Sequence, residues 1–223
     1  MGISPDNLIR FYPQLFHMAE YGTWESISQN GLLSTTALLD MFGITGRERL
    51  NIESSHRPES VSIIHGSYGT AVIRDQKPMS EAALRKCLIN LSPKQWYETL
   101  NRKVFFWLTS ERLLRLLSAR AYRGKRHCVL TVNTERLLRL YLGKITLSPI
   151  NSGNTLYRSQ PRGAETFLPL NKYPFDVRRK LRGRMNAIAE LAVDYHVLNI
   201  EKVVEKVEHM QAERVIEILF QNS

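Results

Sequence analysis

The chain has 223 residues, of which 43% are hydrophobic and 23% charged, so it can bury a substantial core and has the composition of one globular domain. It carries 31 Lys and Arg against 21 Asp and Glu, a formal net charge of +10, which favours a polyanionic partner such as nucleic acid. No apolar run reaches the ~18 residues that span a bilayer, and the N-terminus lacks the layout of a secretory signal. Cys87 and Cys128 lie far apart without a metal-ligand spacing, which indicates reduced thiols in a cytoplasmic protein without a metal or a membrane partner.

The first half of the chain alternates short helices with strand-like segments. An aromatic-rich segment ends at Phe16-His17-Met18, and a helix over 22–31 follows it and ends at Gly31. Ser34 is expected to cap a second helix that Gly43 terminates. After these we expect a polar loop with one helical turn at 46–60. Two short strands at 61–64 and 71–74, joined by a glycine-containing turn, come next, and two further helices begin at Ser80 and Ser92.

The second half is expected to supply the centre of a sheet. An apolar strand is expected at 104–108, followed by a helix at 110–117 that Thr109 or Ser110 caps. A second strand and helix are expected at 128–132 and 134–140. A loop-like stretch at 148–186 then leads to one long alternating strand at 187–198. The tail over 203–220 fits either strand or helix. No linker divides the chain, so we predict a single α+β domain over residues 1–223.

Glu190 is the first candidate for chemistry. It lies on the alternating strand among alanine, leucine and valine residues, where the surroundings tune the pKa of a carboxyl group. A carboxylate there can stabilise positive charge on a sugar, as in glycosidases, or take up a proton. A solvated glutamate on the wet face of an edge strand is the alternative interpretation. Glu165 is a rival that ranks second, because a loop is expected to hold it.

Several other positions have side chains suited to hold a ligand. His17 lies beside aromatic residues, where an imidazole donates to a ribose hydroxyl or a carbonyl, although a lone histidine is more commonly a packing residue. Arg57, in a predicted loop, has the planar group that clamps a diphosphate. Phe106, Trp107 and Tyr122 offer stacking surfaces. Since Phe106 and Trp107 point to opposite faces of a strand, one is expected in the core and the other in a pocket.

A basic tract directly precedes Glu190. Its predicted phosphate contacts are Arg178, Arg179, Lys180, Arg182 and Arg184, with Arg158 and Arg162 as further candidates. Such cations neutralise phosphates and release counterions, so a nucleic acid bound there would be delivered to the carboxylate. A solvated basic loop is the alternative.

The order of these motifs resembles a known family, while other common site motifs are missing. The chain has no Walker loop, GxGxxG fingerprint, HExxH, zinc-type spacing or GxSxG elbow, which leaves kinase, Rossmann, zinc-enzyme and serine-hydrolase functions without support. The chain resembles the DNA ADP-ribosyltransferase toxins of the DarT kind. The resemblance is carried by Phe16-His17-Met18-Ala19, Gly31-Leu32-Leu33, Arg57, the strand and helix within 104–122, and Glu190 to Val193. Ala19 stands where that family has Thr, and the middle segment departs from its pattern.

The resemblance implies an ADP-ribosyltransferase-like split, mixed sheet with surrounding helices and a cleft for NAD as co-substrate. It implies that His17, Met18, Trp107 and Tyr122 bind NAD and that Glu190 and Arg57 are catalytic. The segment before the glutamate selects the acceptor in that family, so the basic tract implies DNA or RNA. The resemblance also implies a toxin or anti-phage effector that acts beside an antitoxin protein.

Three other functions remain open at this point. The same His17 and Glu190 would serve an ADP-ribosyltransferase that modifies a protein. A catalytically inactive nucleic-acid-binding module would bind in a strongly salt-dependent way and ignore NAD. A relative of the tRNA 2′-phosphotransferases would need additional phosphate-binding Arg and His residues, which the sequence does not place.

Overall fold

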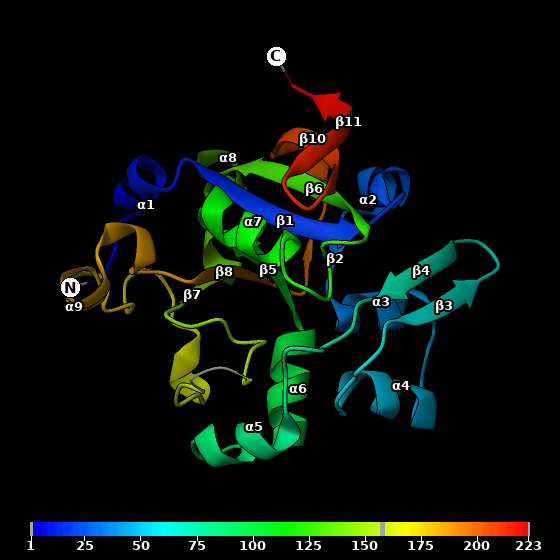
Figure 1. The fold of residues 1–223 in the computed structure, drawn as a ribbon, viewed down its shortest axis with the longest axis horizontal. Coiled ribbons are helices and arrows are strands. Elements are labelled where there is room, and N and C mark those ends of the chain that lie inside the picture. Colours follow the sequence, from blue (N-terminus) through cyan, green and yellow to red (C-terminus); the bar gives the residue numbers. More distant parts are fainter. Residues whose placement is uncertain (1, 157–158, 223) are drawn as a thin grey trace.

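The computed structural model describes residues 2–156 and 159–222. A seven-stranded sheet runs through the molecule, with helices against both faces (Figure 1). Neighbouring strands of this sheet are antiparallel, and a parallel bridge joins Leu88 to Arg162 outside it. The predicted α+β class is therefore confirmed. In spatial order the strands are β11 (Arg214–Gln221), β10 (Val204–Gln211), β6 (Arg126–Asn133), β1 (Gln14–Glu20), β5 (Lys103–Trp107), β8 (Glu190–Asp194) and β7 (Ile145–Ser148).

The sheet is split between β1 and β5. Strand β1 pairs with β6 from Gln14 through Glu20, whereas its pairing with β5 consists of the pair Phe16 and Trp107. The two strands therefore diverge beyond that pair, and backbone and side-chain groups of both line the opening. The sheet is therefore open near its middle as well as at its two edges.

Two helices of almost identical sequence cover opposite faces of the sheet. Thr109 caps α7 (Ser110–Leu117) and Asn133 caps α8 (Thr134–Tyr141), each by accepting a backbone N–H. The leucines of α7 cluster with Val129, while those of α8 cluster with Leu130. Val129 and Leu130 are successive residues of β6 and point to opposite faces, so the same seven-residue pattern serves both sides.

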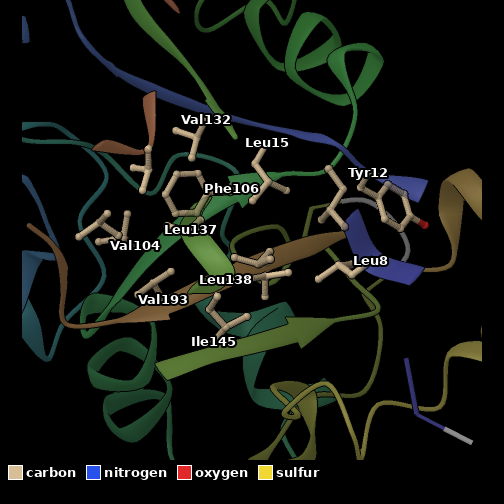
Figure 2. Close-up of a cluster of buried hydrophobic side chains, with 14 of the residues drawn as sticks. Leu8, Tyr12, Leu15, Val104, Phe106, Val132, Leu137, Leu138, Ile145 and Val193 are labelled. Carbon is tan, nitrogen blue, oxygen red and sulfur yellow. The ribbon is translucent and has the colours of Figure 1, made fainter. Parts of the chain in front are cut away.

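The main core lies on the α8 side, where α1 (Pro5–Phe11) also packs. Figure 2 shows Leu8, Leu15, Phe106 and Leu138 in this cluster of buried side chains. Phe106 is 1% exposed, so it is the core member of the predicted aromatic pair.

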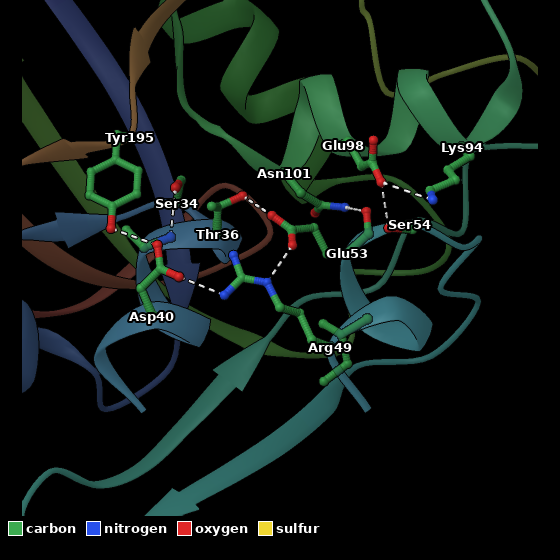
Figure 3. A network of polar contacts seen from close by, with 12 residues as sticks. Ser34, Thr36, Asp40, Arg49, Glu53, Ser54, Lys94, Glu98, Asn101 and Tyr195 are labelled. Carbon is green, nitrogen blue, oxygen red and sulfur yellow. Dashed lines mark hydrogen bonds and ion pairs between the residues drawn. The ribbon is translucent and has the colours of Figure 1, made fainter. Parts of the chain in front are cut away.

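The chain between β1 and β5 adds no strand to the main sheet and forms a layer beside it, apart from its first helix, which packs near β11 (Figure 1). Its elements are α2 (Trp24–Asn30), β2 (Leu32–Leu33), α3 (Thr35–Met41), α4 (Gly46–Glu53), the hairpin β3 (Val61–His65) and β4 (Gly69–Ile73), α5 (Glu81–Cys87) and α6 (Pro93–Asn101). The polar network of Figure 3 joins this layer: Arg49 of α4 bonds both Asp40 of α3 and Glu53, and Asp40 accepts from the hydroxyl of Tyr195. Asn101 of α6 donates to the carbonyl of Glu53. The layer is thereby tied to the chain just after β8.

Three predicted elements differ from the observed ones, and the structure decides the tail that the sequence left open. The segment 46–60, predicted as a polar loop with one turn, contains α4, whose polar residues are satisfied by the network rather than by an apolar core. The stretch 148–186, predicted as loop, holds the 3₁₀ helix η2 (Ala164–Thr166), helix α9 (Phe175–Arg182) and the 3₁₀ helix η3 (Arg184–Asn186). The long strand over 187–198 is interrupted at Tyr195, where φ is +73°, so β9 (His196–Val197) leaves the main sheet and pairs with β2. The undecided tail is the hairpin of β10 and β11, preceded by the 3₁₀ helix η4 (Ile200–Lys202).

A candidate active site at the split of the sheet

A cleft of about 480 Å³ opens where β1 and β5 diverge. Its size lies within the range of small-molecule sites. One wall comes from β1 and β5, and the other from the layer formed between them in the sequence. The six residues that the sequence predicted as catalytic or NAD-binding all line this cleft: His17, Met18, Arg57, Trp107, Tyr122 and Glu190.

Glu190 begins β8 and lies inside the sheet, between β5 and β7. Its backbone pairs with Trp107 on one side and Ser148 on the other, so these side chains share a face. The residue is 4% exposed, so the solvated glutamate of an edge strand is excluded. Both carboxylate oxygens accept the backbone N–H of Ser152, at 3.2 and 3.1 Å.

The surroundings of Glu190 bring the pKa of its carboxyl group close to neutral pH. Burial raises the pKa of its carboxyl group to about 7, which outweighs the opposing effects of the Ser152 hydrogen bonds and of the guanidinium groups of Arg112 and Arg162. A carboxyl group with such a pKa exchanges a proton at neutral pH, as a general base must.

Arg162 holds the loop that bonds Glu190. Its side chain is 2% exposed and donates to the carbonyl oxygens of Ser152 at 2.8 Å and Asn154 at 3.0 Å. Ser152 thus donates its N–H to a buried carboxylate and accepts through its C=O from a buried cation. The prediction that Arg162 is a surface phosphate contact is wrong, because its guanidinium is enclosed, and Arg158 lies outside the described residues.

His17 lies at the divergence of the two strands and presents an acceptor to the cleft. Its Nδ1 is 2.8 Å from the carbonyl oxygen of Phe105 on β5; a carbonyl only accepts, so Nδ1 carries the proton. Burial lowers the pKa of the ring to about 4, so the imidazole is neutral at pH 7 and Nε2 holds a lone pair. The ring donates to a backbone carbonyl, as one of the two predicted roles requires, and is left to accept from a ligand hydroxyl.

Arg57 is bound largely to the protein itself. Its guanidinium donates to the carbonyl oxygens of Ile52 and Arg74 and to Oδ1 of Asn101. Burial lowers its pKa to about 10, which leaves it charged at pH 7. These contacts fix the wall of the cleft, so the geometry favours a positioning role over the predicted direct contact with a diphosphate.

Arg74 is a cleft residue that the sequence reasoning missed. Its guanidinium donates to the carbonyl oxygen of Met18 at 3.3 Å and stacks on the ring of Tyr122, 5.2 Å from the ring centroid. The hydroxyl of Tyr122 donates to Asp75 at 3.1 Å, and burial raises its pKa to about 12. Arg74 ends a predicted strand, and nothing local in the sequence distinguishes it from a solvated strand-end arginine.

Trp107 lies on the opposite face of β5 from Phe106 and lines the cleft, so the predicted division of the pair between core and pocket is observed. It clusters with Phe16, Met18 and Leu113 of α7. The indole and the Met18 thioether therefore form an apolar floor against which a flat ring can lie.

The predicted nucleic-acid tract is a helix rather than a loop and does not line the cleft. Arg178, Arg179, Lys180 and Arg182 belong to α9, and Arg184 begins η3. Arg182 donates to the carbonyl oxygen of Pro149 at 2.7 Å, at the start of the loop that bonds Glu190. The rival Glu165 is exposed in η2 and is not among the residues that line the cleft.

Residues 2–156 and 159–222 contain no group of three or more His, Cys, Asp and Glu residues placed to hold a metal ion. No helix within this part of the chain has the length and apolar character needed to cross a membrane.

Comparison with known proteins gives a family. No curated protein and no solved structure matches the chain. One family model matches residues 13–204, a span that includes both His17 and Glu190. The chain therefore belongs to DUF7002, which is described as a family of unknown function.

Proposed function

We propose that the chain is an NAD-dependent ADP-ribosyltransferase that modifies a nucleic acid. The observation that carries this proposal is the convergence of six residues, chosen from sequence positions as distant as His17 and Glu190, on one cleft of about 480 Å³. The DarT-type resemblance pointed to His17, Arg57 and Glu190 by their order along the chain, whereas Trp107 and Tyr122 were chosen as stacking surfaces. Their meeting at the split of the sheet supports a common ligand site.

Glu190 is the group best placed for the chemistry. In ADP-ribosyl transfer the bond from the ribose to nicotinamide breaks and a bond from the ribose to the acceptor forms. An ionised Glu190 would stabilise the positive charge that develops on the ribose, as carboxylates do in glycosidases. It would then take the proton that the acceptor loses. A pKa of about 7 lets the same carboxyl group do both at neutral pH.

The other cleft residues fit the parts of NAD. The Nε2 lone pair of His17 suits a ribose hydroxyl, and the floor formed by Trp107 and Met18 suits the nicotinamide ring. Arg74 supplies a cation for the diphosphate, beside the ring of Tyr122. Arg57 stiffens the wall on which Arg74 lies through its bond to the Arg74 carbonyl.

A nucleic acid is the acceptor that the charge distribution favours. The chain carries +10 overall, and α9, which precedes Glu190 in sequence, contains three arginines and a lysine within 178–182. The DarT-type resemblance extends the proposal to a toxin or anti-phage effector with an antitoxin partner.

Transfer of labelled ADP-ribose from NAD to DNA, RNA and lysate protein, measured side by side, tests the proposal. Label in DNA or RNA supports it. Label in protein alone keeps the transferase and replaces the acceptor. Absence of label in all three, from protein shown to be folded, rejects the transferase and favours an inactive nucleic-acid-binding module.

A further inference from the structure

Five arginines from two parts of the chain converge next to the candidate active site. Helix α7 contributes Arg112 and Arg115, α9 contributes Arg178 and Arg182, and η3 contributes Arg184. We call these five residues the arginine cluster.

A direct contact between α7 and η3 brings these arginines together, and their charge effects on neighbouring groups agree with that placement. The charges of Arg115 and Arg182 both lower the pKa of Arg112, in addition to its burial. Arg112, Arg178 and Arg182 all oppose the burial that raises the pKa of Tyr173. Arg112 also donates to Oδ1 of Asn186 in η3 at 3.0 Å, which joins α7 to the segment after α9.

Within the part of the chain that the structure describes, the cluster has no ion-pair partner, and the carboxylate whose charge acts on it is the buried Glu190. None of the five arginines forms an ion pair with a carboxylate of residues 2–156 or 159–222. The neighbouring Arg179, by contrast, lies 3.4 Å from Asp176. Like charges gathered without counter-charges attract a polyanion.

The helical form of the tract separates its members. Arg178 and Arg182 are four residues apart and share a face of α9, whereas Lys180 points to another side of the helix. The face that carries Arg178 and Arg182 is the one whose charges act on Arg112 and Tyr173. Of the basic residues on α9, Arg178 and Arg182 therefore belong to the arginine cluster, whereas Lys180 does not. The sequence alone did not indicate this division.

The cluster borders Glu190 outside the NAD cleft. Arg112 is close enough to lower the pKa of Glu190, and Arg182 bonds Pro149 at the start of the loop whose Ser152 N–H binds that carboxylate. None of the five arginines lines the cleft itself. An anion on the cluster would therefore meet Glu190 from the α7 and α9 side while the cleft remains free for NAD.

We propose that the arginine cluster binds the sugar-phosphate backbone of a single-stranded nucleic-acid acceptor and brings one nucleotide to Glu190. This inference rests on the proposed function for its last step. Arginine binds phosphate oxygens through two parallel N–H groups. The exposed side chains of Leu181 and Met185, 72% and 43% exposed, offer apolar contact to unstacked bases. A single strand is the simplest substrate because Glu190 is buried, and a base inside a duplex would first have to be flipped out to reach it.

Binding of fluorescent 20-nucleotide single-stranded DNA and RNA, followed by anisotropy without NAD over a range of salt, tests the cluster. Arg115→Gln and Arg182→Gln remove exposed members. Lys180→Gln and Arg179→Gln remove the same charge from α9 outside the cluster. Each cluster variant is expected to lower the steepness of the log-affinity against log-salt plot by about 0.7, the value for one phosphate contact with a single strand. The two control variants should leave that slope unchanged.

Two results would overturn the inference. Equal losses from cluster and control variants would show that net charge alone attracts the nucleic acid. Binding to vesicles with anionic lipid, without binding to either oligonucleotide, would assign the surface to a membrane. Because this assay contains no NAD, its failure is separate from a failure of NAD cleavage, which would instead reject the proposed function.

Discussion

At the scale of single residues, the central feature is a carboxyl group that burial keeps protonated well above its ordinary range. Glu190 has two N–H contacts, both from Ser152, and two nearby guanidinium groups, yet desolvation dominates and sets its pKa at about 7. Buried carboxyl groups poised in this way are found at sites of proton transfer. They also leave a signature in the stability of the whole protein, which does not depend on any substrate.

That signature is a loss of stability as pH rises. The folded protein retains the Glu190 proton up to pH about 7, whereas the unfolded chain releases it near 4.5. Relative to Glu190→Gln, the unfolding free energy of the wild type should therefore fall between these two values by about 3 kcal/mol, from 1.36 kcal/mol per pH unit. The buried His17, whose pKa is lowered to about 4, makes both proteins more stable as pH rises and so cancels in the comparison. Glu190→Gln should lack this fall.

Urea unfolding at pH 4.5 to 8 measures the effect. The exposed Glu165→Gln provides the matched control and should keep the wild-type pH dependence. If Glu190→Gln and the wild type have parallel stability curves across this range, Glu190 is not the buried group described here.

Substitution of Arg57 should mainly lower stability, whereas substitution of Arg74 should mainly weaken NAD binding. Arg57→Met leaves three buried acceptors without donors, so we expect a loss of roughly 2–4 kcal/mol of stability. Arg74→Met should keep most of the stability and weaken NAD binding, because Arg74 has one hydrogen bond to the protein at 3.3 Å. Urea unfolding and calorimetric titration with NAD separate the two outcomes. A stable Arg57→Met that fails to bind NAD would restore the direct diphosphate contact that the sequence predicted.

At the scale of elements, the sequence predicted most helices and strands but missed α1, α4, α9 and β7. Ser34, Ser80 and Ser92 cap helices as expected, each accepting a backbone N–H. Helix α4 was missed because its residues are mostly polar: its one buried side chain is Ile52, and Arg49 bonds Asp40 and Glu53. Helix α9 was missed because its residues are mostly charged and its one buried side chain is Phe175.

Gly31 is the element boundary that tolerates substitution least. Its φ is +80°, and an added Cβ would lie 2.5 Å from the carbonyl oxygen of Val197, where β2 meets β9. Gly31→Ala should therefore cost well over about 1 kcal/mol. Gly43→Ala, at φ +64° with no atom within 4 Å of the added Cβ, provides the control and should cost about 1 kcal/mol. Equal melting temperatures for the two variants would contradict the close approach of the strands.

The loop that covers Glu190 depends on Arg162. Arg162→Lys keeps the charge but cannot donate to the carbonyl oxygens of both Ser152 and Asn154. The Ser152 N–H should therefore move out of hydrogen-bonding position to the Glu190 carboxylate. The Ser152 hydrogen bonds lower the pKa of Glu190, so the pH midpoint for Glu190 titration should rise in the variant. Carbon NMR of the carboxyl group measures that midpoint directly. An unchanged midpoint in a folded variant would show that the loop holds itself in place.

At the scale of the whole molecule, the split sheet brings together what the sequence keeps apart. The strands that carry His17 and Glu190 lie on either side of β5, and the layer formed by the chain between β1 and β5 closes the cleft around them. His17, Arg57 and Glu190 were predicted as site residues from the sequence, and all three line the cleft. Ser152, Arg162 and Arg112 were not assigned to the site, because their relation to Glu190 arises from loop packing and a long-range contact that leave no local pattern.

The release of nicotinamide from NAD, followed against pH in the presence of single-stranded nucleic acid, tests the central claim most directly. Wild type, Glu190→Gln and Glu165→Gln are compared at equal concentration after each is shown to be folded. We predict release that increases as pH rises through about 7, as Glu190 ionises, with no release from Glu190→Gln and wild-type release from Glu165→Gln. Undiminished release from Glu190→Gln, or no release from the wild type at any pH, would contradict the account.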